Sequence, residues 1–395
     1  MNNISESAFC SGCGVCSAVC PKACINIREN ARGELRPVID DTACISCGKC
    51  KTVCPTFNAI SGESQNATVY LGTAPDFAGN GSSGGVATYF INAILENKTV
   101  DHAVLVKPQN DPDELFSYTV CKTKEDLEKC QGSAYYPVTL QKALNDIKST
   151  DGTFAVIGVP CFINALKKLK ASSGFWDKKL KVLIGIVCGN TPNRHLVDCL
   201  AFKSGHKRED ITSCRFRLND VGRPAWDYGV RLAYSDKSKT VSFGSDDFGF
   251  LFWRRLFIGD CCLNCSDVFA ENADITFMDA WLPEYKEKLE GTSIIICRNK
   301  EFASFFSPLI ESGSLKETKA EDIYTAQEKL VAYKANAGKH GKDKKLALKI
   351  QKTFEKHNGK KDMIEQIRRV VYKENLKGKN PLLWLLVEMK DRLKR

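Results

Sequence analysis

Short apolar runs separated by amphipathic stretches dominate the middle of the chain. The runs FAVIGV (residues 154–159) and VLIGIV (182–187) are almost purely apolar, which is typical of parallel strands covered on both faces. Residues 101–106, 274–278 and 292–297 predict further buried strands. Helical patterns lie between these runs, so we expect an α/β main domain with a mostly parallel or mixed sheet.

The first helix of this domain follows a glycine-rich loop. In GNGSSGGVATYFINAIL (79–95), apolar residues recur with helical spacing at Val86, Phe90 and Ile94. Backbone N–H groups at such a helix start suit a pyrophosphate. Ser-Gly runs are also ordinary loops with a serine cap, so the pattern alone leaves both interpretations open.

The N-terminal residues carry a cysteine spacing that occurs twice, in CSGCGVCSAVCP and CISCGKCKTVCP. Three thiolates two residues apart wrap one 4Fe–4S cluster, and the fourth ligates the partner cluster. One predicted ligand set is Cys10, Cys13, Cys16 and Cys54, and the other is Cys44, Cys47, Cys50 and Cys20. Residues 1–60 are therefore expected to form a small α+β two-cluster ferredoxin-like domain.

Two other uses of cysteine fit less well. A secreted disulfide framework needs a signal peptide, and the opening MNNISESAF has neither a basic region nor an apolar run. Zinc knuckles pair CxxC units across longer gaps and lack the Cys-Pro ending. The chain has 19 cysteines, which without an export signal predicts a reducing cytoplasm. Cys24 is expected to be a small buried side chain.

Four later cysteines occupy positions where a sheet could bring them together. Cys161 and Cys188 follow the two apolar strands, at the edge where open α/β sheets bind ligands, and Cys262 and Cys265 form a CxxC. They could hold a third 4Fe–4S cluster. Buried structural cysteines and a redox-active CxxC disulfide remain the alternatives.

Basic charge is concentrated at the C-terminal end of the chain. Residues 331–395 hold 19 Lys or Arg against seven Asp or Glu, whereas the whole chain has a net charge of +10. We expect a basic helical tail over 319–395, whose apolar PLLWLLVEM could contact a membrane surface or pack on its own domain. No recognition motif for nucleic acid accompanies the charge. The remaining predicted boundaries are a linker at 61–68 and two halves of the main domain at 69–150 and 151–318.

Seven motifs in this order resemble the family formed by the beta subunits of coenzyme F-420 hydrogenases and dehydrogenases. They are SSGGVATYF, CQGSAYYP, FAVIGVPCFINALKK, IVCGN, ITSCRFRLNDVGRPAW, CCLNCSD and ADITFMDAW. The resemblance implies a flavoprotein that holds FAD beside iron–sulfur clusters. It implies flavin contacts at Ser83, Gly84, Gly85, Thr88, Gly132, Ser133 and Tyr135. It also implies a cluster at Cys161, Cys188, Cys262 and Cys265.

Departures from the family pattern fall near the implied flavin. The family usually has Lys where Ala134 stands, Gln where Phe162 stands, and Gly-Asp where Met278 and Asp279 stand. A nearby Lys would favour an anionic coenzyme, so its absence argues against the use of a deazaflavin such as F-420.

The expected function is that of an iron–sulfur flavoprotein oxidoreductase. It would pass electrons between the clusters, with ferredoxin or another redox protein as partner, and an FAD that exchanges two electrons with a soluble carrier or small-molecule substrate. The alternative is a non-catalytic electron-transfer subunit of a larger redox complex. The sequence singles out no catalytic side chain.

Overall fold

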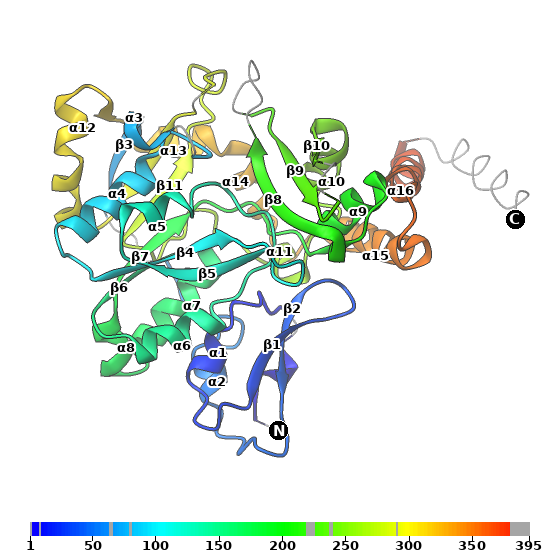
Figure 1. The fold of residues 1–395 in the computed structure, drawn as a ribbon, viewed down its shortest axis with the longest axis horizontal. Helices are drawn as coiled ribbons and strands as arrows, with labels where there is room; N and C mark the ends of the chain where they lie inside the picture. Colours follow the sequence, from blue (N-terminus) through cyan, green and yellow to red (C-terminus); the bar gives the residue numbers. More distant parts are fainter. Residues whose placement is uncertain are drawn as a thin grey trace, which may run out of the picture.

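The computed structural model describes residues 2–7, 9–62, 66–78, 81–218, 226–236, 240–289 and 291–379. An eight-stranded sheet forms the centre of the main domain, in the order β13-β3-β12-β11-β7-β6-β4-β5 (Figure 1). Its strands are β3 (Thr68–Gly72), β4 (His102–Pro108), β5 (Phe116–Cys121), β6 (Phe154–Gly158), β7 (Leu180–Ile186), β11 (Ile275–Asp279), β12 (Ser293–Cys297) and β13 (Leu315–Glu317).

The sheet is mixed, in agreement with the α/β prediction. Strands β4, β6, β7 and β11 are parallel neighbours. Strand β12 runs antiparallel to both β11 and β3, so β3 points the same way as β11. The carboxyl ends of β3, β4, β6, β7 and β11 consequently meet at one edge, while β5, β12 and β13 run in the opposite direction.

Helices pack on this sheet through apolar stripes. Phe90 and Ile94 of α4 (Val86–Glu96) and Ile163 and Leu166 of α7 (Pro160–Ala171) are fully buried in one core with the strands. Pro160 opens α7, a position where the missing N–H of proline costs nothing. The other helical elements around this sheet are α3 (Pro75–Ala78), α5 (Lys124–Glu128), α6 (Gln141–Ser149), α8 (Gly174–Lys179), η4 (Lys300–Phe306) and α12 (Ser307–Glu311).

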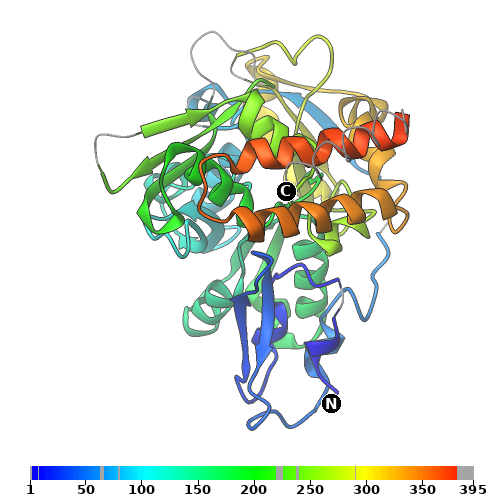
Figure 2. The same cartoon turned by 90° about the vertical axis from the view of Figure 1, so that its right-hand side faces the viewer.

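The N-terminal residues form a small unit beneath the main domain (Figure 2). Its antiparallel hairpin pairs β1 (Ile25–Glu29) with β2 (Leu35–Ile39). Short helices α1 (Val15–Ala18) and α2 (Lys49–Thr52) follow the two cysteine loops, and η1 (Ile4–Glu6) precedes them. Gly14 and Gly48 cap α1 and α2 with φ of 82° and 73°, a conformation that favours glycine.

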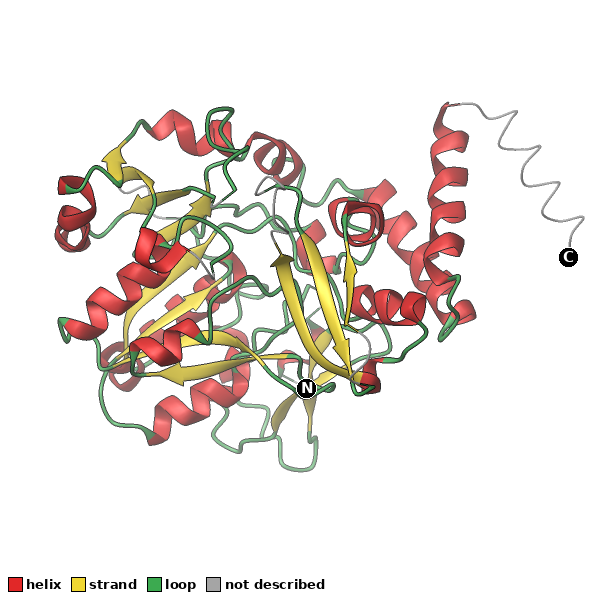
Figure 3. Cartoon of the chain, turned by 45° about the horizontal axis from the view of Figure 1, so that its top comes forward, coloured by secondary structure: helices red, strands yellow, loops and turns green. Residues whose placement is uncertain are grey.

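A second, three-stranded sheet was not expected from the sequence. It consists of β8 (Ile211–Leu218), β9 (Gly229–Tyr234) and β10 (Thr240–Phe243), all antiparallel, and lies beside the main sheet (Figure 3). Its apolar face packs with helical segments in a separate core. These segments include α9 (His195–Ser204), the π-helix η3 (Ser245–Gly249) and α10 (Phe250–Trp253). Two short helices, η2 (Arg208–Asp210) and α11 (Asp260–Leu263), lie in the same stretch of the chain.

In the residues described up to 379, β13 is followed by α13 (Ala320–Ala326), α14 (Glu328–Lys334), α15 (Gly341–His357) and α16 (Met363–Lys379). Phe354 of α15 and Ile367 of α16 are buried in the core that contains α9, so these two helices pack on the protein. The basic run GKHGKDKK (338–345) spans the break before α15 and its first turn, because α15 begins at Gly341. PLLWLLVEM lies outside the described residues. No helix in the described ranges is long and apolar enough to cross a membrane.

Candidate redox site

The structure brings Cys10, Cys13, Cys16 and Cys54 together. This arrangement agrees with the prediction that the fourth cysteine of each run binds the cluster of the other run. Burial raises the pKa of Cys16, and the charges of the other three cysteines raise it further. The N–H of Gly12 donates to Cys10 Sγ at 3.3 Å. Because these thiols resist losing a proton to water, a cationic iron centre that displaces the protons suits them.

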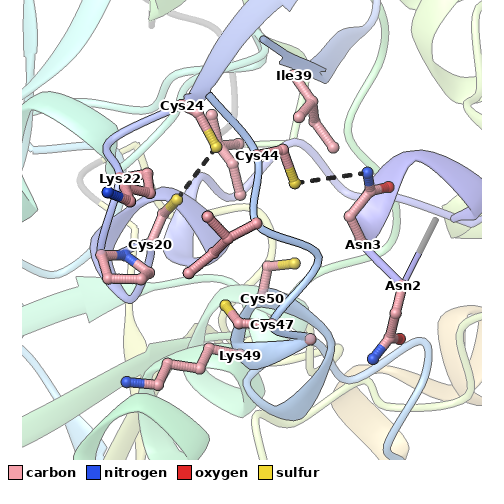
Figure 4. A pocket seen from close by; sticks show the side chains of 14 residues that line it. Asn2, Asn3, Cys20, Lys22, Cys24, Ile39, Cys44, Cys47, Lys49 and Cys50 are labelled. Carbon is pink, nitrogen blue, oxygen red and sulfur yellow. Dashed lines mark hydrogen bonds between the residues drawn. The ribbon is translucent and has the colours of Figure 1, made fainter. Parts of the chain in front are cut away.

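The second predicted set lines one cavity in the N-terminal unit (Figure 4). Cys20, Cys44, Cys47 and Cys50 all face it. Asn3 Nδ2 donates weakly to Cys44 Sγ at 3.9 Å. Cys47 is exposed, so this end of the unit is open to solvent. Cys24 is buried as expected, but it also lines the cavity, with its Sγ 3.4 Å from that of Cys20.

The later cysteines also converge. Cys161 is the second residue of α7, Cys188 follows β7, Cys262 belongs to α11, and Cys265 follows that helix. Burial raises the pKa of Cys161, and charges on the other three cysteines raise it further. Burial, together with the charges of Cys262 and Cys265, raises the pKa of Cys188 to about 12. Burial and neighbouring cysteines oppose the ionisation of Cys161 and Cys188, and a cluster whose iron compensates the negative charge fits such a group.

In the part of the chain that the structure describes, no three His, Cys, Asp or Glu side chains converge closely enough to hold one metal ion. A 4Fe–4S cluster binds each thiolate to a different iron, so its ligands stand further apart than those of a single ion.

Sequence reasoning missed two residues at the third set. Cys261 Sγ lies 3.8 Å from Cys262 Sγ, and this contact is the main reason that the pKa of Cys262 falls to about 7. Lys334 of α14 is buried and donates from Nζ to Cys265 Sγ at 3.4 Å. Burial lowers the pKa of Lys334, but the charges of Cys188, Cys265 and Cys262 outweigh burial and raise it.

The β1–β2 hairpin connects the first cysteine set to the third. Arg32 pairs with Asp260 of α11 at 3.2 Å. Burial lowers the pKa of Arg36, and the charges of Glu34, Cys10 and Cys261 raise it more strongly, so its guanidinium is close to Cys10 of the first set and to Cys261, which adjoins the third. Cys13 in turn contributes to the raised pKa of Cys161.

The loop before α6 fixes the same junction from the other side. Leu140 N–H donates to the carbonyl oxygen of Cys13 at 2.9 Å. Gln141 accepts from Ile27 N–H at 2.9 Å and donates to the carbonyl oxygen of Ile25 at 3.0 Å. The module and the main domain are thus held by backbone contacts at the cysteine loop itself.

The first predicted flavin stretch lies at the carboxyl edge of the main sheet. Ser83 Oγ donates to the carbonyl oxygen of Thr292 at 3.0 Å. A Cβ at Gly84 would lie 2.8 Å from the carbonyl oxygen of Gly72, the last residue of β3. Gly85 caps α4 with a φ of 77°, and Thr88 is half-buried in the first turn. These residues pack the loop onto the sheet and leave the start of α4 facing its edge.

The second predicted stretch borders the first. Gln131 Nε2 donates to the carbonyl oxygen of Phe77, and a Cβ at Gly85 would lie 2.6 Å from the backbone of that same residue. Gly132 and Ser133 line a cavity closed on the other side by β8. The Tyr135 ring packs instead against four neighbouring rings, those of Phe216, Tyr228, Phe248 and Phe252.

A buried cation beside this stretch also escaped sequence reasoning. Arg217, at the end of β8, pairs with Asp279 at the end of β11. Its guanidinium lies over the rings of Tyr228 and Trp281, and its Nε and Nη2 have no hydrogen-bond partner among the described residues. Arg217 also has a φ of 54°, which is uncommon for a residue with a side chain. The motif CRFR contains two arginines, and sequence alone does not indicate which of them is buried.

Comparison with known proteins gives four family matches. "Coenzyme F420 hydrogenase/dehydrogenase, beta subunit N-term" matches residues 69–145, and the description for the C terminus of that subunit matches 151–323. Two "4Fe-4S dicluster domain" descriptions match residues 9–58 and 36–100. The prediction of a two-cluster N-terminal module is thereby confirmed.

The chain is similar to two archaeal proteins with assigned functions. It is 31% identical over 76% of its length to coenzyme F420-dependent sulfite reductase of Methanocaldococcus jannaschii, covering 46% of that protein. It is 26% identical over 47% of its length to one of the subunits of the F(420)H(2) dehydrogenase of Methanosarcina mazei, covering 54% of it. The chain thus spans about half the length of these relatives.

A solved structure shares the fold. It is a chain of the F420-reducing [NiFe] hydrogenase complex from Methanosarcina barkeri, with a TM-score of 0.50, 15% identity, and coverage of 76% of this chain and 98% of that one. The paired family matches over residues 69–145 and 151–323 follow the same motif order that the sequence displays. The chain belongs to the family of coenzyme F420 hydrogenase/dehydrogenase beta subunits.

Proposed function

We propose that this protein is an iron–sulfur flavoprotein oxidoreductase. In this proposal the N-terminal module holds two 4Fe–4S clusters and exchanges electrons with a ferredoxin-type partner. The main domain holds a third cluster at Cys161, Cys188, Cys262 and Cys265. It also holds an FAD, which lies near the start of α4 and near the turn at Gly132. FAD supplies the conversion between one-electron and two-electron transfer.

The contact between the β1–β2 hairpin and α11 carries this proposal. Arg36 is close enough to Cys10 and to Cys261, the neighbour of Cys262, for both to raise its pKa, and Arg32 pairs with Asp260, so the first cysteine set adjoins the segment that carries Cys262. The charge of Cys50 contributes to the raised pKa of Cys16, so the first and second cysteine sets are close to each other within the module. The three sets therefore form a series, from the exposed Cys47 to the interior of the main domain.

The residues around the proposed flavin would bind and shield it. N–H groups at the start of α4 face the sheet edge and suit a pyrophosphate. The cavity at Gly132 and Ser133 lies close by, since both stretches contact the Phe77 turn. Arg217 has two N–H groups without a partner and a buried position, so it is suited to donate to a polar edge of a conjugated ring.

The names of the relatives suggest which class of molecule could exchange two electrons with the FAD. Both names refer to coenzyme F420, so a soluble two-electron carrier of the deazaflavin class is a candidate for this chain. Ala134, where the family usually has Lys, lines the Gly132 cavity and carries no charge, although Arg215 lines the same cavity. We therefore propose a two-electron carrier or small molecule as the partner, without restricting it to F420.

Anaerobic reduction by a low-potential donor tests the function. Protein purified without oxygen is treated with acid, and the released cofactor is identified by mass. The intact protein is then mixed with reduced ferredoxin while flavin absorbance is followed. We expect one FAD per chain, fully reduced by ferredoxin, because the series of clusters reaches from the surface to the flavin edge.

A matched pair of cysteine variants supplies the control. Cys188→Ala removes a proposed ligand and should slow flavin reduction while the module clusters are still reduced. Cys297→Ala changes a buried cysteine at the end of β12 and should leave the rate unchanged. Protein that carries clusters but releases no flavin would contradict the enzyme proposal and support a relay subunit of a larger redox complex.

A further inference from the structure

Lys334 is a buried lysine for which the structure offers no carboxylate partner. It ends α14, only 3% of its surface is exposed, and among the described residues no Asp or Glu forms an ion pair with it. Its Nζ donates to the carbonyl oxygen of Asp267 and to Cys265 Sγ, the latter at 3.4 Å. An ammonium removed from water is costly unless an anion compensates it.

The packing of α14 holds this ammonium beside the third cysteine set. A Cβ at Gly189, next to Cys188, would lie 2.7 Å from the Leu330 side chain, so the helix sits tightly over that turn. Arg255 lies over the ring of Tyr333 at 3.9 Å, and Gly338 N–H donates to the carbonyl oxygen of Leu263 at 2.9 Å. The segment from α14 to Gly338 therefore packs across the loop that carries Cys262 and Cys265.

The anionic groups that can compensate Lys334 are therefore the cysteines. A 4Fe–4S cluster with four thiolate ligands carries net negative charge, which increases by one on reduction. A fixed cation beside a ligand sulfur favours the more negative, reduced state. Net charge and hydrogen bonds to sulfur are established determinants of cluster potential.

We propose that Lys334 sets the reduction potential of the third cluster, holding it above that of the module clusters so that electrons pass inward. This inference rests on the proposed third cluster. Lys334 lies C-terminal to the family match that ends at residue 323, so α14 would give this chain a control over electron flow that its matched domains do not contain.

The test is a potentiometric titration of anaerobic protein followed by electron paramagnetic resonance. Lys334→Gln keeps a hydrogen-bond donor without the charge, and Lys334→Met removes both at similar length. Lys329, exposed on the same helix, gives the matched control Lys329→Gln. Module clusters in the same sample serve as an internal reference. Wild-type protein with about twelve irons establishes the third cluster independently.

In both Lys334 variants we expect the midpoint potential of the third cluster to fall by about 59 mV. This shift corresponds to a reduced-to-oxidised ratio about tenfold lower at the wild-type midpoint, for a one-electron couple. The module midpoints and Lys329→Gln should not change. An unchanged third-cluster midpoint in Lys334→Gln would overturn the inference while leaving the proposed function intact. Loss of four irons in both variants would also overturn it, because Lys334 would then only support the local fold. Wild-type protein with about eight irons would remove the third cluster itself.

Discussion

Arg217 Nη1 donates to Asp279 Oδ2 at 2.7 Å, and this ion pair joins the small sheet to the carboxyl edge of the main sheet. Burial lowers the pKa of Arg217, but the charge of Asp279 raises it more, so the guanidinium stays charged in the interior. The pair lies beside Tyr228, which also hydrogen-bonds to Tyr135. Residues from three separate motifs therefore meet at the proposed flavin site.

Replacement of Arg217 should destabilise the protein. Arg217→Gln leaves Asp279 without its partner in a site that is only partly open to water, with an expected cost of about 3 kcal/mol. Arg215→Gln, on the same strand but exposed, should change stability by less than about 0.5 kcal/mol. Melting temperatures of the two variants give the comparison. Equal melting temperatures would show that the pair contributes little.

Gly84→Val should abolish flavin binding while sparing the clusters. The first carbon of the new side chain would collide with the carbonyl oxygen of Gly72 and approach Ser293 N within 3.1 Å. The loop would have to move away from the sheet edge and take the start of α4 with it. Flavin released by acid should fall to background, with iron content unchanged. Ser82→Ala in the same loop is the control, and retained flavin in Gly84→Val would place the cofactor elsewhere.

Acid should loosen the module from the main domain. Glu29 accepts from Arg208 at 2.7 Å and from Arg194 at 2.8 Å. Burial raises the pKa of Glu29, but these two arginines lower it more, giving a net decrease. Its stabilising contribution is therefore fully present above the unfolded pKa of about 4.3 and is lost as pH falls through the lower folded pKa.

The comparison of wild type with Glu29→Gln isolates this effect. At neutral pH the variant should be less stable by about 1 kcal/mol, because Glu29 is exposed and solvent screens its ion pairs. The difference in melting temperature should shrink as pH falls below about 4. Asp41→Asn, exposed on the module, should show no such trend. A wild-type advantage that stays constant down to acid pH would argue against a role for the Glu29 carboxylate.

Local spacing is sufficient to predict some of this architecture. Each of the two Cys-Pro runs is a continuous stretch of sequence, so a few neighbouring residues are enough to predict its loop. The strands before Cys161 and Cys188 are almost purely apolar, which predicts that they are buried. The parallel pairing of β6 with β7 then brings the two cysteines to one edge. These inferences need no knowledge of distant contacts.

Distant contacts decide the rest. The antiparallel direction of β12 depends on how its connection runs, and its pattern, SIIIC, would suit either direction. From the sequence, Arg217 and Lys334 would be assigned to the surface, because only the tertiary fold buries them. The family resemblance implies a flavin contact at Tyr135, yet rings from β8, β9 and the η3–α10 segment occupy the surroundings of its ring.

Iron content per chain is the most direct measurement of the central claim, that a third cluster connects the module to the main domain. Anaerobically purified wild-type protein should contain about twelve irons, and Cys188→Ala about eight, with module signals retained. Cys188 suits this test better than Cys262, because Cys261 lies close enough to replace Cys262 as a ligand. About eight irons in both proteins would contradict the account.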